Sequence, residues 1–301
     1  MTMDRRGFLA AGIATAATGA APGARAQDAR IVRPIARGAE SLPAIGLGTW
    51  LTFAVGDQSG ERAVRSEVLR RFLAGGGRLI DSSPMYGSAE EVVGDLLGGL
   101  GRAGEVFSAT KVWTTGRMLG ERQMYRSLGY WGLRRFDLVQ VHNLLDWETQ
   151  LPLLREWRAQ GRIRYVGVTT SHGRRHAEME SLMRREPLDF VQFSYSLADR
   201  SAEQRLLPLA ADRGISVIAN RPFDGGELFA RVRGRALPGW AADAGIANWA
   251  QLFLKFVIAH PAVTCAIPAT ANPAHMSENI GALRGPLPEA RLLRLMATVL
   301  G

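Results

Sequence analysis

The chain has 301 residues, 47% of them hydrophobic, which is enough to bury the core of one barrel-sized domain or of two smaller domains. Cys265 is the only cysteine, so the sequence excludes an intrachain disulfide and gives no support to a disulfide-stapled secreted fold. The formal charge of +9 comes mainly from arginines spread along the chain, without interleaved aromatic residues. We therefore expect no nucleic-acid partner, because that class of binding needs a clustered basic surface.

The first element in chain order is a targeting segment. Arg5 and Arg6 precede an apolar stretch rich in Ala, Gly and Thr, and an Ala-Arg-Ala cleavage site ends at Ala26. This pattern indicates a signal peptide of the twin-arginine type over residues 1–26. The apolar stretch is too short to span a bilayer, so we expect no stable membrane anchor after processing. A periplasmic or exported location is expected for residues 27–301, and a disordered cytoplasmic tail is the alternative interpretation.

From residue 44 onward, short apolar runs alternate with longer amphipathic stretches. The runs are rich in Val, Ile, Leu and Phe without strict alternation, which is typical of parallel strands buried on both faces. They lie at residues 44–50, 79–83, 106–111, 136–142, 163–169, 190–196, 215–220 and 263–268. Helical spacing of apolar residues occurs between them, at residues 61–73, 90–97, 148–160, 201–213 and 249–259.

Eight strands, each followed by a helix, in about 270 residues predict an α/β fold, a closed (β/α)8 TIM barrel. An open doubly wound sheet is the alternative. It is disfavoured because Gly46 and Gly48 lack the third glycine of a dinucleotide-binding G-x-G-x-x-G turn. Residues 31–43 are expected to form a short hairpin at the bottom of the barrel, and residues 288–300 a terminal helix packed outside it.

Four polar residues stand at the ends of three successive predicted strands: Asp81 and Tyr86, then Lys111, then His142. Each alone also fits a structural role, but the chemistry of a (β/α)8 barrel lies at these strand ends, so together they predict a catalytic site. A nearby ammonium lowers the pKa of a phenol, and an aspartate holds that ammonium in place. A histidine can then donate to a substrate oxygen, so the group is suited to reducing a carbonyl.

Over residues 31–301 the chain resembles the aldo-keto reductase family. The segments that carry the resemblance are Gly-Leu-Gly-Thr-Trp at 46–50, Asp-Ser-Ser-Pro-Met-Tyr-Gly-Ser-Ala-Glu at 81–90, Ala-Thr-Lys at 109–111 and Val-His at 141–142. The resemblance implies that Tyr86 is the general acid, that Lys111 and Asp81 tune it, and that His142 orients the carbonyl. It also implies hydride delivery from a nicotinamide cofactor bound across the barrel mouth.

The resemblance further implies a set of cofactor-binding residues, several of which diverge from the family pattern. Thr170 lacks the amide that the family places there, and His275 stands where a basic residue meets the 2′-phosphate. We therefore expect NADP(H) as cofactor, with NAD(H) as the alternative. The implied contacts are Thr169, Gln192, Arg221, Phe223, Thr270, His275, Glu278 and Asn279, and Trp50 and Trp113 are expected to line an apolar substrate pocket.

The expected function is that of an exported, monomeric reductase acting on a small aldehyde or ketone. The alternative is a cofactor-binding regulatory or interaction subunit with little turnover, and the proton relay itself is compatible with the oxidative direction. We expect no metal site, because the histidines are scattered and His172 and His176 lack a suitably arranged carboxylate. Gly173 interrupts that pair, so the segment is interpreted as a surface loop.

Overall fold

The structure, a computed structural model, describes residues 30–300. The predicted signal peptide, residues 1–26, lies outside the described residues. Within the described part of the chain, none of the helices combines the length and apolar character needed to cross a lipid bilayer.

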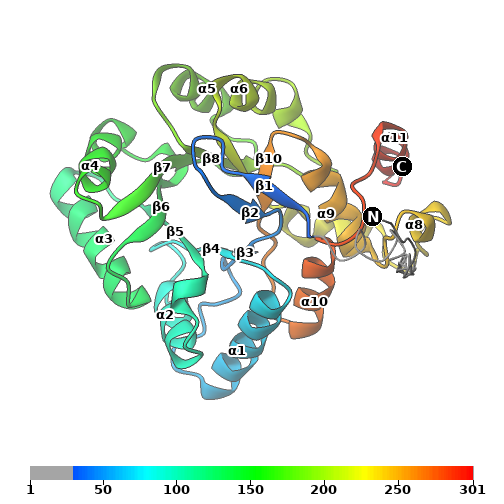
Figure 1. Cartoon of the computed structure of the whole chain (residues 1–301), viewed down its shortest axis with the longest axis horizontal. Helices are drawn as coiled ribbons and strands as arrows, with labels where there is room; N and C mark the ends of the chain where they lie inside the picture. Colours follow the sequence, from blue (N-terminus) through cyan, green and yellow to red (C-terminus); the bar gives the residue numbers. More distant parts are fainter. Residues whose placement is uncertain (1–29, 301) are drawn as a thin grey trace, which may run out of the picture.

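Eight parallel strands follow one another around a nearly closed barrel, so the predicted fold is confirmed (Figure 1). Each strand pairs with the next one in the chain, as short βα connections in a barrel require. All eight apolar runs contain a strand, although most strands are shorter than the run. The strands are β3 (Leu47–Gly48), β4 (Leu79–Asp81), β5 (Phe107–Val112), β6 (Phe136–Val141), β7 (Ile163–Thr169), β8 (Phe190–Ser194), β9 (Ser216–Asn220) and β10 (Val263–Ala266).

The barrel closes along a short seam between the segments that contain β3 and β10. The backbone N–H of Gly46 donates to the carbonyl of Ala266 (2.8 Å), and the N–H of Ala266 donates to Ala44 (2.9 Å). The N–H of Gly48 donates to Pro268 (3.1 Å). A Cβ on Gly48 would lie 3.0 Å from a backbone carbonyl oxygen across the seam. Glycine therefore lets the two edges approach closely, and within the predicted run 44–50 only Leu47–Gly48 forms a regular strand.

Helices surround the barrel, and Figure 1 shows them outside the ring of strands. The long connection between β9 and β10 carries two additional short helices, which accounts for its length. The surrounding helices are α1 (Ser59–Ala74), α2 (Ala89–Gly99), α3 (Arg117–Trp131), α4 (Trp147–Ala159), α5 (His176–Arg185), α6 (Leu206–Arg213), α9 (Trp249–Ala259) and α10 (Pro273–Gly281). The additional helices are α7 (Glu227–Arg231) and α8 (Trp240–Asp243), and the terminal helix α11 (Ala290–Ala297) is present as predicted. Single 3-10 turns span Ala103–Glu105, His142–Leu144, Ser201–Glu203 and Asp224–Gly226.

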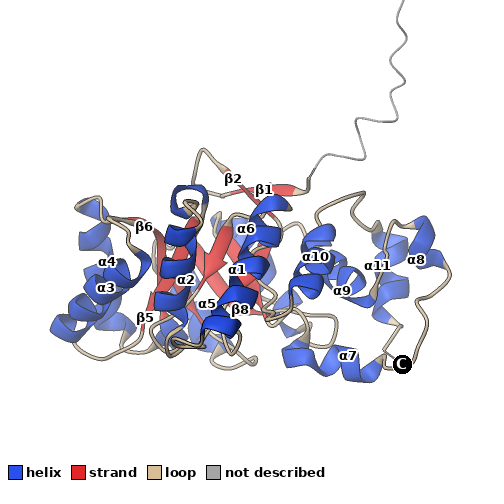
Figure 2. Cartoon of the chain, turned by 90° about the horizontal axis from the view of Figure 1, so that it is seen from below, coloured by secondary structure: helices blue, strands red, loops and turns tan. Residues whose placement is uncertain are grey.

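An antiparallel hairpin closes the bottom of the barrel, as predicted. Its strands are β1 (Val32–Pro34) and β2 (Ser41–Pro43), which Figure 2 shows beyond the ends of the barrel strands. Ile35 and Leu42 from this hairpin join the cluster of side chains that fills the barrel interior. Full burial of one such side chain contributes about 1.5–3 kcal/mol. The interior is therefore packed at this end.

Candidate active site

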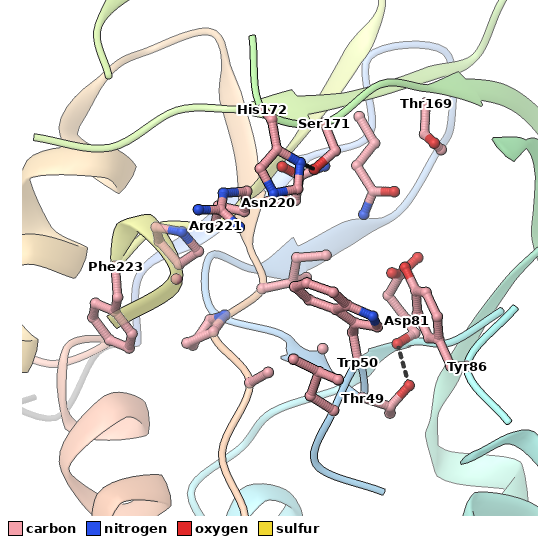
Figure 3. A pocket seen from close by; sticks show the side chains of 18 of the residues that line it. Thr49, Trp50, Asp81, Tyr86, Thr169, Ser171, His172, Asn220, Arg221 and Phe223 are labelled. Atoms are coloured by element: carbon pink, nitrogen blue, oxygen red, sulfur yellow. Dashed lines mark hydrogen bonds between the residues drawn. The ribbon is translucent and has the colours of Figure 1, made fainter. Parts of the chain in front are cut away.

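A cavity of about 650 Å³ opens at the carboxyl ends of the strands, where the sequence predicted the site. Figure 3 shows polar side chains entering it from several strand ends and Trp50 beside Tyr86 and Asp81. Among the predicted residues, those that line the cavity are Trp50, Asp81, Tyr86, His142, Thr169, Gln192, Arg221 and Phe223. The structure thus brings together most of the predicted catalytic set and about half of the predicted cofactor set.

Lys111 and Asp81 form a buried ion pair beneath this cavity. The strands β4 and β5 are neighbours, and this pairing places Lys111 Nζ 2.6 Å from Asp81 Oδ2. The ammonium also donates to the carbonyl oxygen of Ser82 (2.8 Å). Burial lowers the pKa of Lys111, but Asp81 and Tyr86 raise it by more, so the net pKa lies above its ordinary value. Lys111 is therefore a cation at neutral pH although its side chain is only 1% exposed.

Gln140 is a residue of this site that the sequence reasoning missed. It lies on β6 beside Lys111, and its side-chain N–H donates to the second carboxylate oxygen of Asp81 (3.4 Å). Its own Oε1 is buried without a hydrogen-bond partner among the described residues. A Cβ on Gly167 of β7 would lie 3.1 Å from Gln140 Cγ, so glycine there leaves room for the amide. The signal available in the sequence was a polar residue inside the apolar run at 136–142.

Tyr86 lies over Lys111 and faces the cavity. The ammonium is 5.0 Å from the centre of the phenol ring, within the range of a cation–π contact. Burial raises the pKa of Tyr86, and although Lys111 lowers it, the net pKa stays above the ordinary value. The ammonium thus acts in the expected direction, but desolvation is the larger effect and sets the sign of the net shift. The phenol accordingly holds its proton at neutral pH.

His142 lines the same end of the cavity as Tyr86. Its Nδ1 is 2.9 Å from Ser83 Oγ, and its ring meets the Tyr86 ring edge-on, with centroids 5.7 Å apart. Burial, with a smaller contribution from Lys111, lowers the pKa of His142 to about 2. The imidazole is therefore neutral at any physiological pH, and its ring edge stands beside the phenol that faces the cavity.

The polar groups around Thr169 and Thr170 differ from the family pattern in a specific way. The Thr169 hydroxyl accepts the backbone N–H of Asn143 (3.2 Å), while Thr170 Oγ1 is buried and has no partner among residues 30–300. Asn220, at the end of β9, donates its side-chain amide to the Thr170 carbonyl (2.9 Å) and lines the cavity. An amide is thus present here, but it comes from a different strand than the resemblance implied.

Besides Lys111, which lies beneath the cavity, five predicted residues do not line it. Trp113 is 41% exposed on the loop after β5, away from the cavity lining. The others belong to the loop and helix after β10: Thr270, His275, Glu278 and Asn279. Thr270 Oγ1 accepts the N–H of Asn272, whose own side chain caps α10. Asn279 is buried, and His275 and Glu278 are exposed, so their role as adenosine contacts remains a prediction.

The sequence predicts a surface loop after β7, and residues 172–175 are exposed in a turn as expected, but this loop also lines the cavity. His172 lines the cavity, and its ring meets that of Trp50 edge-on with centroids 6.5 Å apart. Figure 3 shows the two residues on different sides of the cavity. Ser171, Arg174 and Arg175 line the same wall. No set of three or more His, Cys, Asp or Glu side chains suited to a metal ion occurs in the described part of the chain.

Comparisons of sequence and of structure both find reductases as relatives of this chain. Methylglyoxal reductase YeaE of Escherichia coli (strain K12) is 32% identical over 262 residues, which cover 85% of this chain and 90% of the relative. The NADH-specific methylglyoxal reductase of the same strain is 28% identical over 235 residues, covering 67% of this chain and 70% of the relative. An aldo/keto reductase from Klebsiella pneumoniae, solved with NADP and acetate, has a TM-score of 0.72 at 29% identity, with 85% and 90% coverage.

The profile of the Aldo/keto reductase family matches residues 44–298, which is most of the chain and includes every strand of the barrel. The order of the strands, the polar residues at their ends and the similarity to these relatives all agree with that match. On this evidence the chain belongs to the aldo/keto reductase family.

Proposed function

We propose that the protein reduces a small aldehyde or ketone to the alcohol, using NADPH or NADH, with Tyr86 as the general acid. The observation that carries this proposal is the buried Asp81–Lys111 ion pair, whose ammonium lies 5.0 Å from the Tyr86 ring at the cavity floor. An ion pair with a purely structural role would need no phenol above it, so the position of Tyr86 favours a role in proton transfer. Two relatives named as methylglyoxal reductases make small reactive aldehydes the first substrates to test, with both cofactors.

The wall of the cavity away from Tyr86 fits a nicotinamide cofactor. Thr170 Oγ1 is buried without a partner among the described residues, and Gln192 and Asn220 bring amide groups to the same wall. An amide-bearing ligand would satisfy the Thr170 hydroxyl, because buried hydroxyls are normally hydrogen-bonded, whereas the Asn220 amide is already bonded to Ser194 and to the Thr170 carbonyl. Arg221 would pair with phosphate oxygen atoms of the cofactor. When bound, the reduced nicotinamide supplies a hydride to the carbonyl carbon of the substrate.

The residues at the other end of the cavity would handle the proton. Tyr86 holds its phenolic proton at neutral pH and transfers it to the carbonyl oxygen as negative charge develops there. Lys111 then compensates the charge left on the phenolate, and Asp81 keeps Lys111 in place. We take the Ser83 hydroxyl to donate to His142 Nδ1, which puts the ring proton on Nε2. His142 can therefore donate to the same carbonyl oxygen and orient it.

Steady-state kinetics test this proposal. Purified protein should oxidise NADPH or NADH in the presence of methylglyoxal, and Tyr86→Phe should lower kcat by roughly 10²–10⁴-fold, the usual contribution of a general acid. Cofactor affinity, measured by fluorescence titration, should stay unchanged. Tyr130→Phe is the matched control, because Tyr130 is exposed on α3 and does not line the cavity. Equal rates for Tyr86→Phe and wild type would refute the assignment, and cofactor binding without turnover would favour a regulatory subunit.

We also propose that residues 1–26 direct export by the twin-arginine pathway. The support is the Arg5-Arg6 pair before a short apolar stretch and an Ala-x-Ala site. Fractionation of cells that express the full chain should recover the protein outside the cytoplasm. Replacing both arginines with lysine should retain it in the cytoplasm, and equal distribution of the two forms would contradict the proposal.

A further inference from the structure

Three arginines line one wall of the cavity, and the proton relay uses none of them. Arg174 and Arg175 lie on the loop after β7, and Arg221 follows β9; we call them the arginine rim. Figure 3 shows Arg221 and His172 on the wall opposite Tyr86 and Asp81. Asp81 is the sole carboxylate among the cavity-lining side chains that the structure describes, and Lys111 neutralises it. The lining of the cavity therefore carries a net positive charge.

The three arginines differ in how far their charge is already compensated. Arg221 pairs with Asp224 at 3.3 Å, and Arg175 pairs with Glu178 at 2.5 Å. Within residues 30–300, no carboxylate lies within ion-pair distance of Arg174, whose side chain is exposed at the cavity mouth. Arg174 and Arg221 both contribute to lowering the pKa of His172 after burial, so the two cations act on the same space. Arg174 is thus the least compensated charge of the rim.

The loop that carries Arg174 and Arg175 is fixed to the reacting end of the cavity. The Arg175 guanidinium donates to the backbone carbonyl of Asn143 (2.5 Å), the residue directly after His142. The loop itself is a tight turn, with positive φ at His172, Gly173 and Arg175. The N–H of His172 donates to a side chain of β8, which anchors the other end of the turn. A ligand whose carbonyl lies against His142 therefore has these cations nearby.

We propose that the physiological substrate is a carbonyl compound that also bears a carboxylate, which Arg174 binds while the carbonyl lies between Tyr86 and His142. The inference rests on the proposed function and narrows its substrate class. The planar guanidinium suits a carboxylate, which it can bind through two hydrogen bonds. Arg221 is assigned to the cofactor, and Arg175 is largely committed to Glu178 and Asn143, so the substrate contact falls mainly to Arg174.

Pairs of probes that differ only in charge test the inference: 4-oxobutanoate and 4-formylbenzoate, each against its methyl ester, at saturating cofactor. In the wild type, each acid should have a kcat/KM about tenfold above that of its ester, equivalent to about 1.4 kcal/mol. Arg174→Ala should remove this preference by raising the KM for the two acids. The kcat/KM for both esters should stay within twofold of the wild-type value. Arg135→Ala is the control, because it removes the same charge just before β6 begins, at the opposite end of the barrel. High salt should weaken the preference for the acids.

The possible outcomes separate the two proposals. Equal kcat/KM for acid and ester in the wild type would overturn the inference and leave the carbonyl reductase intact. A matching loss of cofactor affinity in Arg174→Ala would assign Arg174 to the cofactor and also overturn it. No turnover of any probe or of methylglyoxal would refute the proposed function and the inference with it. Circular dichroism of Arg174→Ala checks that the variant is folded.

Discussion

Replacing Asp81 with asparagine removes the carboxylate that compensates a buried ammonium. The two side chains are 3% and 1% exposed and their charged atoms are 2.6 Å apart, so water cannot take over the role of Asp81. Burial alone lowers the pKa of Lys111, and the main group that raises it is Asp81. In Asp81→Asn we therefore expect the native state to release the Lys111 proton rather than bury an unpaired charge.

The cost of that release sets the size of the effect. Deprotonating a lysine of ordinary pKa about 10.4 costs about 5 kcal/mol at pH 7 and about 2 kcal/mol at pH 9. The pKa of Lys111 is lower in the folded variant than in its unfolded chain, so the unfolded chain binds more protons and stability rises with pH. The wild type keeps its charged pair over this range. The loss of unfolding free energy in Asp81→Asn should therefore shrink by about 3 kcal/mol between pH 7 and pH 9.

Urea unfolding at both pH values, followed by tryptophan fluorescence, measures this loss. Asp57→Asn is a matched control, because Asp57 is fully exposed, and its unfolding free energy should change by less than about 0.5 kcal/mol. Adding Lys111→Met to Asp81→Asn removes the orphaned amine and should restore about 2–4 kcal/mol at pH 7. A loss in Asp81→Asn that is equal at pH 7 and pH 9 would refute the reasoning.

Three further predictions concern other parts of the barrel. Gln140→Leu should lower kcat about tenfold, an order-of-magnitude expectation for a lost positioning contact to Asp81, without changing cofactor affinity in a fluorescence titration. Gly94→Ala should destabilise the protein by more than about 2 kcal/mol in urea unfolding, because the added Cβ would overlap the Tyr130 carbonyl oxygen. Gly98→Ala in the same helix is the control: its Cβ would have no neighbouring atom within 4 Å, so this variant should be more stable than the wild type. Cys265 is buried in the barrel interior and burial raises its pKa, so a thiol reagent should label it only after unfolding, and rapid labelling of native protein would contradict its placement.

The barrel was predictable because buried parallel strands leave continuous apolar runs, and because strand ends share one face. Asp81, Lys111 and His142 each stand at the end of such a run, so their convergence followed from the fold. The sign of the pKa shift of Tyr86 did not follow, because a motif names its neighbours but does not show how deeply the phenol is buried.

Other features of the site were not predictable for reasons of backbone geometry. The loop at 171–175 looks like polar surface in the sequence and is exposed, but the sequence does not show that the same residues line the cavity or that His172 and Arg175 adopt positive φ. The sequence does not indicate which group Asn220 contacts, and only the structure shows its amide donating to the carbonyl of Thr170, just after β7. Such contacts join segments that lie far apart in the chain, as the 50-residue separation of Asn220 and Thr170 illustrates.

The short seam of the barrel has a consequence for how the cavity moves. Three backbone hydrogen bonds hold the segment at 44–48 to Ala266 at the end of β10 and to Pro268 just after it, and Trp50 lies two residues beyond Gly48. Segments with few hydrogen bonds open at a lower free energy than the rest of a structure. The amides of Gly46 and Gly48 should therefore exchange with deuterium before those at the centres of β5, β6 and β7. Because Trp50 follows this seam and meets His172 across the cavity mouth, we expect such openings to alter the Trp50 side of the entrance.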